Sequence, residues 1–347
     1  HILTNGPQIQ RFENEFADYV GVKHAVAVSS GTAALEILLR LFGVEGREVI
    51  VPTNTFVATP TSVVLSGGRV VFADIKADSL CIDPADLERK ITSKTKGVIV
   101  VHIAGLICPE IDKIKKICHD HNLFLIEDAA HAHGAKIEDR MAGSLCDGGA
   151  FSFYPTKIMT TGQGGMVTIN DSAIASKAHS MRDHGLTPDR IMTMIGDNWC
   201  MSEVTAILGR HQLAELDTFV NKRNEIAKYY DSLLSGVESV SKFRKPSNFR
   251  HSYYKYPVLV KDVNRTELMT VLKKEYAIET GSLYYPPCHL HPWFKENLGT
   301  KKGDLPVSEK VLKQVLCLPM HLGVTKETAQ YVVKSLKNSL KQSFKHS

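Results

Sequence analysis

The stretch AVAVSSGTAALEILLRLF (25–42) decides the fold. Its first four residues are apolar and typical of a short buried strand, and Ser29-Ser30-Gly31-Thr32 follows at once. From Ala33 to Phe42 the large apolar residues recur at helical spacing. A buried strand that turns directly into a helix is the building unit of an α/β sheet.

The same alternation continues over the first two hundred residues. Further buried strands are expected at 48–51, 69–73, 97–102, 123–127, 149–153 and 165–169, with helices at 84–91 and 110–121. Continuous apolar strands that alternate with helices predict a mostly parallel sheet covered on both faces. Such sheets bind ligands at the carboxyl ends of their strands, so informative residues are expected there.

The chain changes character after about residue 235. Residues 203–234 contain no proline and predict one long connector helix. Beyond it we expect a strand at 253–260, a helix at 265–276, a loop around Pro286-Pro287 and a final helix around 325–341. The pattern predicts a large α/β domain over 1–235 and a small α+β domain over 236–347.

Composition excludes several classes of protein. The 347 residues carry 42 basic and 37 acidic side chains, a net charge of +5 with the signs interspersed, which gives no argument for nucleic acid. The longest apolar stretch, 98–108, is too short to cross a membrane and is typical of a buried strand. Seven cysteines without a C-x-x-C pair favour a reducing, cytoplasmic location.

Three groups of residues at strand ends could carry chemistry. Ser30-Gly31-Thr32 opens a helix, where free N–H groups attract a phosphate, although a plain N-cap turn has the same sequence. Asp128 ends an apolar strand and could pair with a protonated ring nitrogen, or merely cap a helix. Lys157 follows a later strand and could form a Schiff base, although most loop lysines are only solvated. Together these are the three attachment points that pyridoxal 5′-phosphate requires.

Longer blocks of sequence extend this argument to the whole chain. They are LTNGPQIQRFENEFADYVGVKHAVAVSSGTAAL (3–35), PTNTFVAT (52–59), IEDAAHAHGA (126–135), FSFYPTKIMTTGQGGMV (151–167), RDHG (182–185), GDNWCMSEVTAILGRHQL (196–213) and LCLPMHLGVT (316–325). In this order they resemble the DegT/DnrJ/StrS aminotransferases. The resemblance implies the fold-type-I pyridoxal-phosphate transferase architecture, with a mostly parallel central sheet and a smaller C-terminal α+β domain.

The resemblance also implies catalytic and cofactor-binding residues. Lys157 matches the Schiff-base lysine and Asp128 the partner of the pyridinium nitrogen. Phe56 matches the aromatic residue that stacks on the cofactor ring, and His131 a residue near the cofactor's O3′. The matching phosphate ligands are Ser30, Gly31, Thr32, Ser152 and Asn198. In the family this asparagine reaches the phosphate of the neighbouring subunit, which implies a homodimer with shared active sites.

Substrate-binding residues are expected in the proline-rich loop. The resemblance suggests that His289 lines a sugar pocket, and Tyr285 could contact the sugar, although packing at the domain junction explains an aromatic residue there equally well. Three His-x-His pairs, 119/121, 131/133 and 289/291, have spacing that zinc could use, but their positions favour no metal site.

The implied activity is transfer of an amino group from an amino acid, with L-glutamate the expected donor, to a keto sugar, most often nucleotide-linked. Lys157 would leave its internal aldimine and move the proton, in a ping-pong sequence that serves amino-sugar and polysaccharide synthesis. Dehydration of a sugar on the same cofactor and a non-catalytic regulator are the alternatives. Relatives that dehydrate replace the lysine by histidine, so the retained Lys157 favours amino transfer.

The 196–201 block departs from the family pattern. Asp197, Trp199 and Cys200 stand where the family usually has a bulky residue, a tyrosine and an arginine. These changes could alter substrate contacts or the seam between subunits, and they bear directly on the role expected for Asn198.

Overall fold

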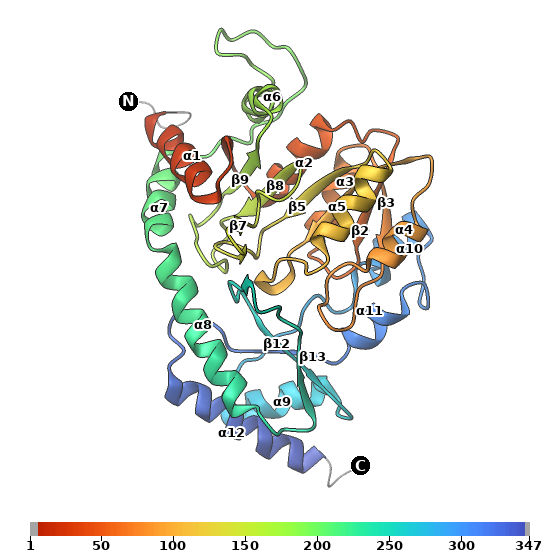
Figure 1. The fold of residues 1–347 in the computed structure, drawn as a ribbon, viewed down its shortest axis with the longest axis vertical. Helices are drawn as coiled ribbons and strands as arrows, with labels where there is room; N and C mark the ends of the chain where they lie inside the picture. The colour runs from red at the N-terminus through yellow and green to blue at the C-terminus, as the bar shows by residue number, and fades with distance from the viewer. Residues whose placement is uncertain (1–5, 344–347) are drawn as a thin grey trace.

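The structure is a computed structural model that describes residues 6–343. Residues 1–5 and 344–347 lie outside the described residues. They include the outer ends of the two predicted domains and the first residues of the 3–35 block. The described chain forms a large unit around a central sheet and a smaller unit below it, joined along one side by a pair of helices (Figure 1).

The central sheet has seven strands in the order β1-β9-β8-β5-β4-β2-β3. Their bounds are β1 His24–Val28, β2 Glu48–Pro52, β3 Arg69–Ala73, β4 Thr95–Val101, β5 Phe124–Asp128, β8 Gly148–Ser152 and β9 Gly165–Ile169. Only β9 runs against its neighbours β1 and β8, and the other pairings are parallel. The prediction of a mostly parallel sheet is therefore confirmed.

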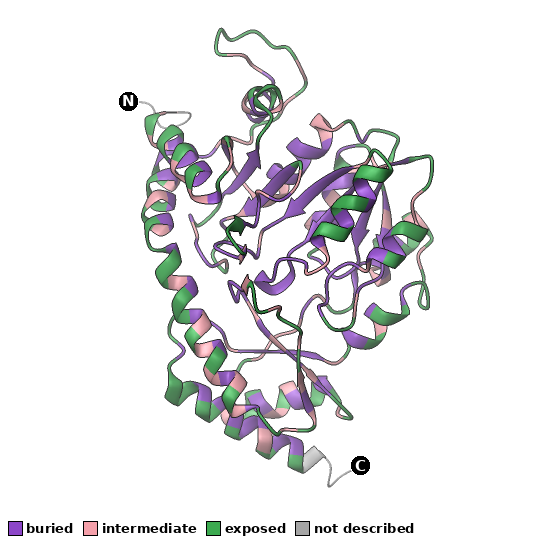
Figure 2. Ribbon diagram, in the orientation of Figure 1, coloured by how far each residue is buried: buried purple, intermediate pink, exposed green. Residues whose placement is uncertain are grey.

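Helices cover both faces of this sheet, as the continuous apolar strands require. They are α1 Pro7–Val20, α2 Gly31–Leu41, α3 Ala58–Leu65, α4 Pro84–Arg89, α5 Ile111–Asp120 and α6 Ser172–Arg182. Figure 2 shows the strands buried and the outer helix faces exposed. Two apolar clusters, one on each side of the strands, make up the core of the large unit.

The predicted connector helix is interrupted. It consists of α7 Glu203–Ala214 and α8 Leu216–Leu233, which run from beside α1 down to the small unit (Figure 1). Glu215 between them has φ −96° and ψ −2°, which breaks the helical ladder. Neither proline nor glycine marks this position, so the single helix expected over 203–234 was wrong for a reason that the local sequence does not carry.

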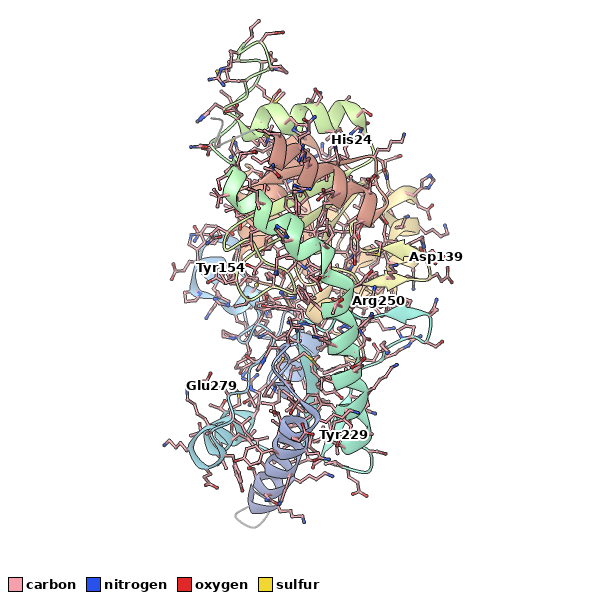
Figure 3. The ribbon with its side chains drawn as sticks, turned by 90° about the vertical axis from the view of Figure 1, so that its left-hand side faces the viewer. His24, Asp139, Tyr154, Tyr229, Arg250 and Glu279 are labelled. Atoms are coloured by element: carbon pink, nitrogen blue, oxygen red, sulfur yellow. The ribbon has the colours of Figure 1, made fainter. Side chains whose placement is uncertain are left out.

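The small unit is built on a three-stranded antiparallel sheet, β10-β12-β13. Its elements are β10 Val240–Lys242, β12 Tyr256–Val260, α9 Arg265–Tyr276, β13 Val315–Leu318 and α12 Lys326–Ser343. A third apolar cluster, drawn from residues 227–340, fills it. Arg250 lies beside α8, where its guanidinium meets the Asp217 carboxylate at 2.7 Å (Figure 3).

The proline-rich segment departs from a simple split at residue 235. It contains the short helices η2 Cys288–Leu290, α10 Pro292–Leu298 and α11 Pro306–Val311. Its residues Cys288, Phe294 and Leu305 pack into a core cluster of the large unit. The domain boundary stays a prediction. This segment belongs to the predicted small domain by sequence but packs against the large unit.

Two strand predictions extended too far. The apolar stretch 98–108 is strand only to Val101, where β4 ends, and continues as the 3₁₀ turn η1 Ile103–Gly105. The strand expected over 253–260 begins at Tyr256, because Tyr253 adopts φ 49°. A sheet of two-residue strands, β6 Lys136–Ile137, β7 Arg140–Met141 and β11 Phe249–Arg250, completes the fold. Between residues 6 and 343, no helix combines the length and apolar character needed to cross a bilayer.

Candidate active site

A cavity of about 440 Å³ opens at the carboxyl ends of the central strands. Its walls include residues that end or follow β1, β4, β5 and β8, together with Tyr254 and Tyr284 from the region after α8. Eight of the nine predicted cofactor residues line it: Ser30, Gly31, Thr32, Phe56, Asp128, His131, Ser152 and Lys157. The cavity thus brings together chain segments more than two hundred residues apart.

One end of the cavity is the turn into α2. The Ser30 hydroxyl oxygen accepts the Ala33 N–H at 3.1 Å and caps the helix. A Cβ atom at Gly31 would lie 2.8 Å from the Ser152 Cβ, so only glycine lets this turn rest on β8. The first N–H groups of α2 and the hydroxyls of Thr32 and Ser152 are left around a concave site. Free helix N–H groups and hydroxyls are the donor set that a phosphate group prefers.

Asp128 ends β5 beside a pair of buried threonines. Its Oδ2 accepts a hydrogen bond from the Thr59 hydroxyl at 2.7 Å, and its Oδ1 accepts the Ala130 N–H at 3.2 Å. Thr55 Oγ1 lies 2.6 Å from Thr59 Oγ1. Because the carboxylate only accepts, Thr59 spends its single proton on Asp128, and Thr55 must donate to Thr59. Each carboxylate oxygen keeps a lone pair that a ring N–H in the cavity could use.

Lys157 is half-buried on the cavity wall. Its pKa is lowered to about 8, chiefly by burial; the Asp128 carboxylate opposes this shift and the charge of Lys255 adds to it. Its Nζ lies 4.8 Å from the centroid of the Tyr254 ring. An amine with such a pKa is partly neutral near pH 8 and can act as a nucleophile or a base.

Phe56 and His131 line the cavity with aromatic surface. The Phe56 side chain is 56% exposed although it is large and apolar, and its ring centroid lies 6.0 Å from that of Tyr284. His131 is buried, stacked on Tyr254 at 4.2 Å, and its Nε2 lies 2.9 Å from the Tyr284 hydroxyl. An exposed ring that lines a cavity is free to stack on a flat ligand.

Three predicted residues lie elsewhere. Asn198 is exposed on the segment between α6 and α7, its N–H donates to Asp197 Oδ1 at 2.7 Å, and it is not among the cavity residues of its own chain. Tyr285 also lies outside the lining, with its ring centroid 4.7 Å from the Arg265 guanidinium.

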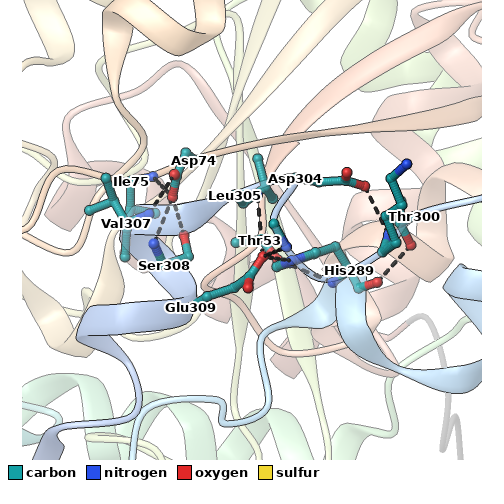
Figure 4. A network of polar contacts seen from close by, with 12 residues as sticks. Thr53, Asp74, Ile75, His289, Thr300, Asp304, Leu305, Val307, Ser308 and Glu309 are labelled. Carbon is teal, nitrogen blue, oxygen red and sulfur yellow. Dashed lines mark hydrogen bonds and ion pairs between the residues drawn. The ribbon is translucent and has the colours of Figure 1, made fainter.

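His289 is fully buried in a polar network of its own (Figure 4). Its Nδ1 lies 2.8 Å from the Thr53 hydroxyl and its Nε2 lies 3.1 Å from the Glu309 carboxylate. Both ring nitrogens are therefore used inside the protein, and the expectation that this side chain lines a sugar pocket is not met by the described chain. The N–H of the adjacent Cys288 donates to the Thr53 carbonyl at 3.1 Å. This bond holds the start of the loop that carries Phe56.

Sequence reasoning missed several cavity residues, among them Thr55, Thr59 and Tyr254. Thr55 and Thr59 lie inside the quoted block PTNTFVAT, but nothing in the block says which hydroxyl faces the aspartate. Of the His-x-His pairs, His131 lies in the cavity, whereas His133 packs against Phe151 and burial lowers its pKa to about 3. The described residues contain no group of three metal-ligating side chains close enough to hold an ion.

Comparison with known proteins identifies the family of the chain. The sequence profile of the DegT/DnrJ/EryC1/StrS aminotransferase family matches residues 1–337. The chain belongs to this family. It is 36% identical to the spore coat polysaccharide biosynthesis protein SpsC of Bacillus subtilis, over 98% of this chain and 91% of SpsC. It is also 36% identical to the GDP-perosamine synthase of Caulobacter vibrioides, over 96% of this chain and 91% of that enzyme.

The solved structures place the fold in the same family. The PLP-form of Spr1654 from Streptococcus pneumoniae superimposes with a TM-score of 0.93 at 26% identity, over 99% of this chain and 93% of that chain. The chain is accordingly an aminotransferase of the DegT/DnrJ/EryC1/StrS family with the fold of pyridoxal-phosphate enzymes, and pyridoxal 5′-phosphate is its cofactor. The cradle at Gly31, the carboxylate of Asp128 and the low-pKa amine of Lys157 fit that cofactor's phosphate, ring nitrogen and aldehyde.

Proposed function

We propose that the protein transfers an amino group from an amino acid, with L-glutamate as the donor, to a keto sugar linked to a nucleotide. The observation that carries the proposal is the convergence of Asp128, Lys157 and the α2 cradle in one cavity. The names of its relatives support the sugar: one is a polysaccharide biosynthesis protein and another a synthase of the GDP-linked sugar perosamine.

The cavity suggests a position for each part of the cofactor. The N–H groups of Gly31 and Thr32 with the Ser30, Thr32 and Ser152 hydroxyls would hold the phosphate. Asp128 would hold the proton on the ring nitrogen, and Phe56 would cover one face of the ring. When bound, pyridoxal 5′-phosphate withdraws electrons from the carbon that gains or loses the amino group.

Lys157 has two tasks in this scheme. Its neutral amine would hold the cofactor by condensing with the aldehyde carbon, with loss of water. When the donor's amine takes its place, the freed Nζ would remove the proton from the donor's α-carbon, and in the second half-reaction it would deliver a proton to the acceptor carbon. A pKa of about 8 suits both directions, because the amine then takes up and releases a proton at little cost near neutral pH. The products are a keto acid and an amino sugar.

We further propose that the active protein is a homodimer. Large apolar side chains stand exposed on the segment before α7 and on α7 itself, including Ile195 at 70% and Val204 at 69% exposure. We call the group Ile191, Met192, Ile195, Val204, Ile207 and Leu208 the 191–208 patch. Exposed large apolar side chains gathered in one stretch of sequence are typical of a protein interface. Asn198 lies within this segment and outside the cavity of its own chain, which leaves it available to the partner's phosphate site, as the family resemblance implies. We also propose a cytoplasmic location, supported by seven cysteines that form no disulfide bond with one another in the described chain.

An absorption spectrum of the purified protein with pyridoxal 5′-phosphate tests the function. We expect a visible band that L-glutamate bleaches and that a GDP-linked keto sugar restores, with one amino group gained by the sugar. A sugar that loses a hydroxyl group without gaining nitrogen would replace the proposal by dehydration. If the band of the bound cofactor does not change with any amino acid, the protein is a non-catalytic regulator.

A further inference from the structure

Tyr284 brings to the cavity a hydroxyl group that none of the proposed roles uses. It lies on the loop between α9 and η2, lines the cavity, and faces Phe56 and His131 with ring centroids 6.0 and 5.9 Å away. Its backbone φ is 42°. A left-handed backbone is uncommon for a bulky residue, and such positions concentrate at functional sites.

The hydrogen bonds of His131 determine which way the Tyr284 hydroxyl points. The Ala104 N–H donates to Nδ1 of His131 at 3.3 Å, so Nδ1 carries no proton. Burial, with the charges of Lys157 and Lys255, holds the pKa of His131 well below its usual range, so the ring is neutral and its proton is on Nε2. Nε2 lies 2.9 Å from the Tyr284 oxygen, which must therefore accept this proton.

The Tyr284 hydroxyl proton is left without a protein acceptor. In the described part of the chain, His131 is the one hydrogen-bond partner of this hydroxyl, and it acts as the donor. Burial raises the pKa of Tyr284, so the hydroxyl keeps its proton. The stacked Tyr254 ring, 4.2 Å from His131 and tilted by 26°, keeps the imidazole from turning away. A half-buried donor without a protein partner is costly, and Tyr284 lines the cavity, where a bound molecule can supply the acceptor.

We propose that Tyr284 donates a hydrogen bond to an oxygen atom of the molecule in the cavity and that His131 is the positioning residue that aims it. The inference rests on the proposed function and adds a binding residue to it. The acceptor is a phenolate or carbonyl oxygen, which either the cofactor's ring hydroxyl or the keto sugar supplies. The proposal also changes the role expected of His131, because its Nε2–H donates to Tyr284 and does not reach the cofactor's O3′.

The test compares Tyr284→Phe with Tyr331→Phe, which loses the same atom from an exposed tyrosine of α12 outside the cavity lining. If the acceptor belongs to the cofactor, Tyr284→Phe weakens pyridoxal-phosphate binding about tenfold and shifts the pH titration of the visible band, with no sugar present. If it belongs to the sugar, both stay unchanged and the KM for the GDP-linked keto sugar rises about tenfold. Tyr331→Phe should match the wild type in all three measurements.

The positioning role has its own readout. His131→Phe should reproduce part of the Tyr284→Phe defect. The double variant should be no worse than Tyr284→Phe alone, because both residues act through the same hydrogen bond from Tyr284 to the ligand. Additive defects would leave His131 with a separate role. The inference is overturned if the wild type binds the cofactor and transfers amino groups while a folded Tyr284→Phe matches it throughout. A wild type without a visible band would instead defeat the proposed function.

Discussion

At the scale of single residues, the direction of each hydrogen bond decides what a side chain can offer. Asp128 can only accept, so Thr59 must donate to Asp128 and Thr55 must donate to Thr59. Both threonines are buried, so water does not replace them. The relay orients the carboxylate before any ligand enters the cavity.

Replacing Thr59 by valine should disturb that orientation with almost no change of shape. Loss of a hydrogen bond to a charged group costs about 1.5–3 kcal/mol, so we expect pyridoxal-phosphate binding or transamination to weaken by about tenfold or more. Titration of the visible band and steady-state rates measure this. Thr59→Ser should restore both. Thr61→Val, which removes a hydroxyl bonded only to backbone carbonyls, is the control; equal defects in both would refute the relay.

The pH response of Lys157 gives a second prediction. Its pKa of about 8 is held down by burial and raised by the Asp128 charge. Below that pKa the amine is protonated and cannot attack a carbonyl, so capture of pyridoxal 5′-phosphate should accelerate as pH rises through about 8. Asp128→Asn removes the supporting charge, so the midpoint should move to lower pH. Stopped-flow rates across the pH range check the sign, and a shift to higher pH would contradict it.

At the scale of elements, the cavity depends on how closely three segments approach. β9 passes directly under the turn before α2, where a Cβ atom at Gly165 would lie 2.3 Å from the Ser30 carbonyl carbon. On the other side, the segment 288–309 holds the loop after β2 through Thr53. The positions of the phosphate cradle and of Phe56 are thus set by backbone packing.

Gly165→Ala should push this turn out of place. We expect overpacking to cost about 1–3 kcal/mol of unfolding free energy and to weaken binding of the cofactor, because the cradle shifts with the turn. Urea unfolding and cofactor titration report the two effects. Gly281→Ala, where the nearest atom would lie 3.7 Å away, should leave both unchanged. Tight cofactor binding by Gly165→Ala would show that the turn does not hold the phosphate.

Asp74 is the second structural test. Its carboxylate accepts the Val307 N–H at 2.9 Å and the Ser308 N–H at 2.8 Å, and so anchors α11 (Figure 4). Asp74→Ala leaves these N–H groups unpaired, so we expect a loss of about 3 kcal/mol in unfolding free energy. Asp78→Ala, which removes an exposed partner of Arg244, should cost little. Similar urea midpoints for the two variants would argue against the anchor.

At the scale of the whole molecule, the active site lies where the two units meet. Ser30, Asp128 and Lys157 come from the large unit, and Tyr254 and Tyr284 come from the part of the chain beyond α8. The 191–208 patch leaves apolar surface exposed on the same large unit. A single chain therefore presents both a cavity and an uncovered face.

Placing a charge in the 191–208 patch should separate the proposed dimer. Ile207→Glu would bury an unpaired carboxylate in the interface, which is strongly unfavourable. We expect light scattering to show the mass of one chain of 38.4 kDa instead of two, with weakened transamination. Leu322→Glu, an equally drastic change at an exposed leucine outside the patch, should leave the mass unchanged. A wild-type mass of one chain, with full activity, would refute the dimer.

The sequence by itself determined the strands of the central sheet, the mostly parallel architecture and the convergence of Ser30-Gly31-Thr32, Asp128 and Lys157, because each depends on local apolar patterning and on strands ending at one edge. Tertiary structure alone decided the break at Glu215, the internal pairing of His289 and the orientation of Thr59 toward Asp128. The last two depend on residues that are distant in sequence, 236 positions apart for Thr53 and His289. The direction of a hydrogen bond and the orientation of a side chain are fixed only when such distant segments pack together. A local sequence pattern therefore does not predict them.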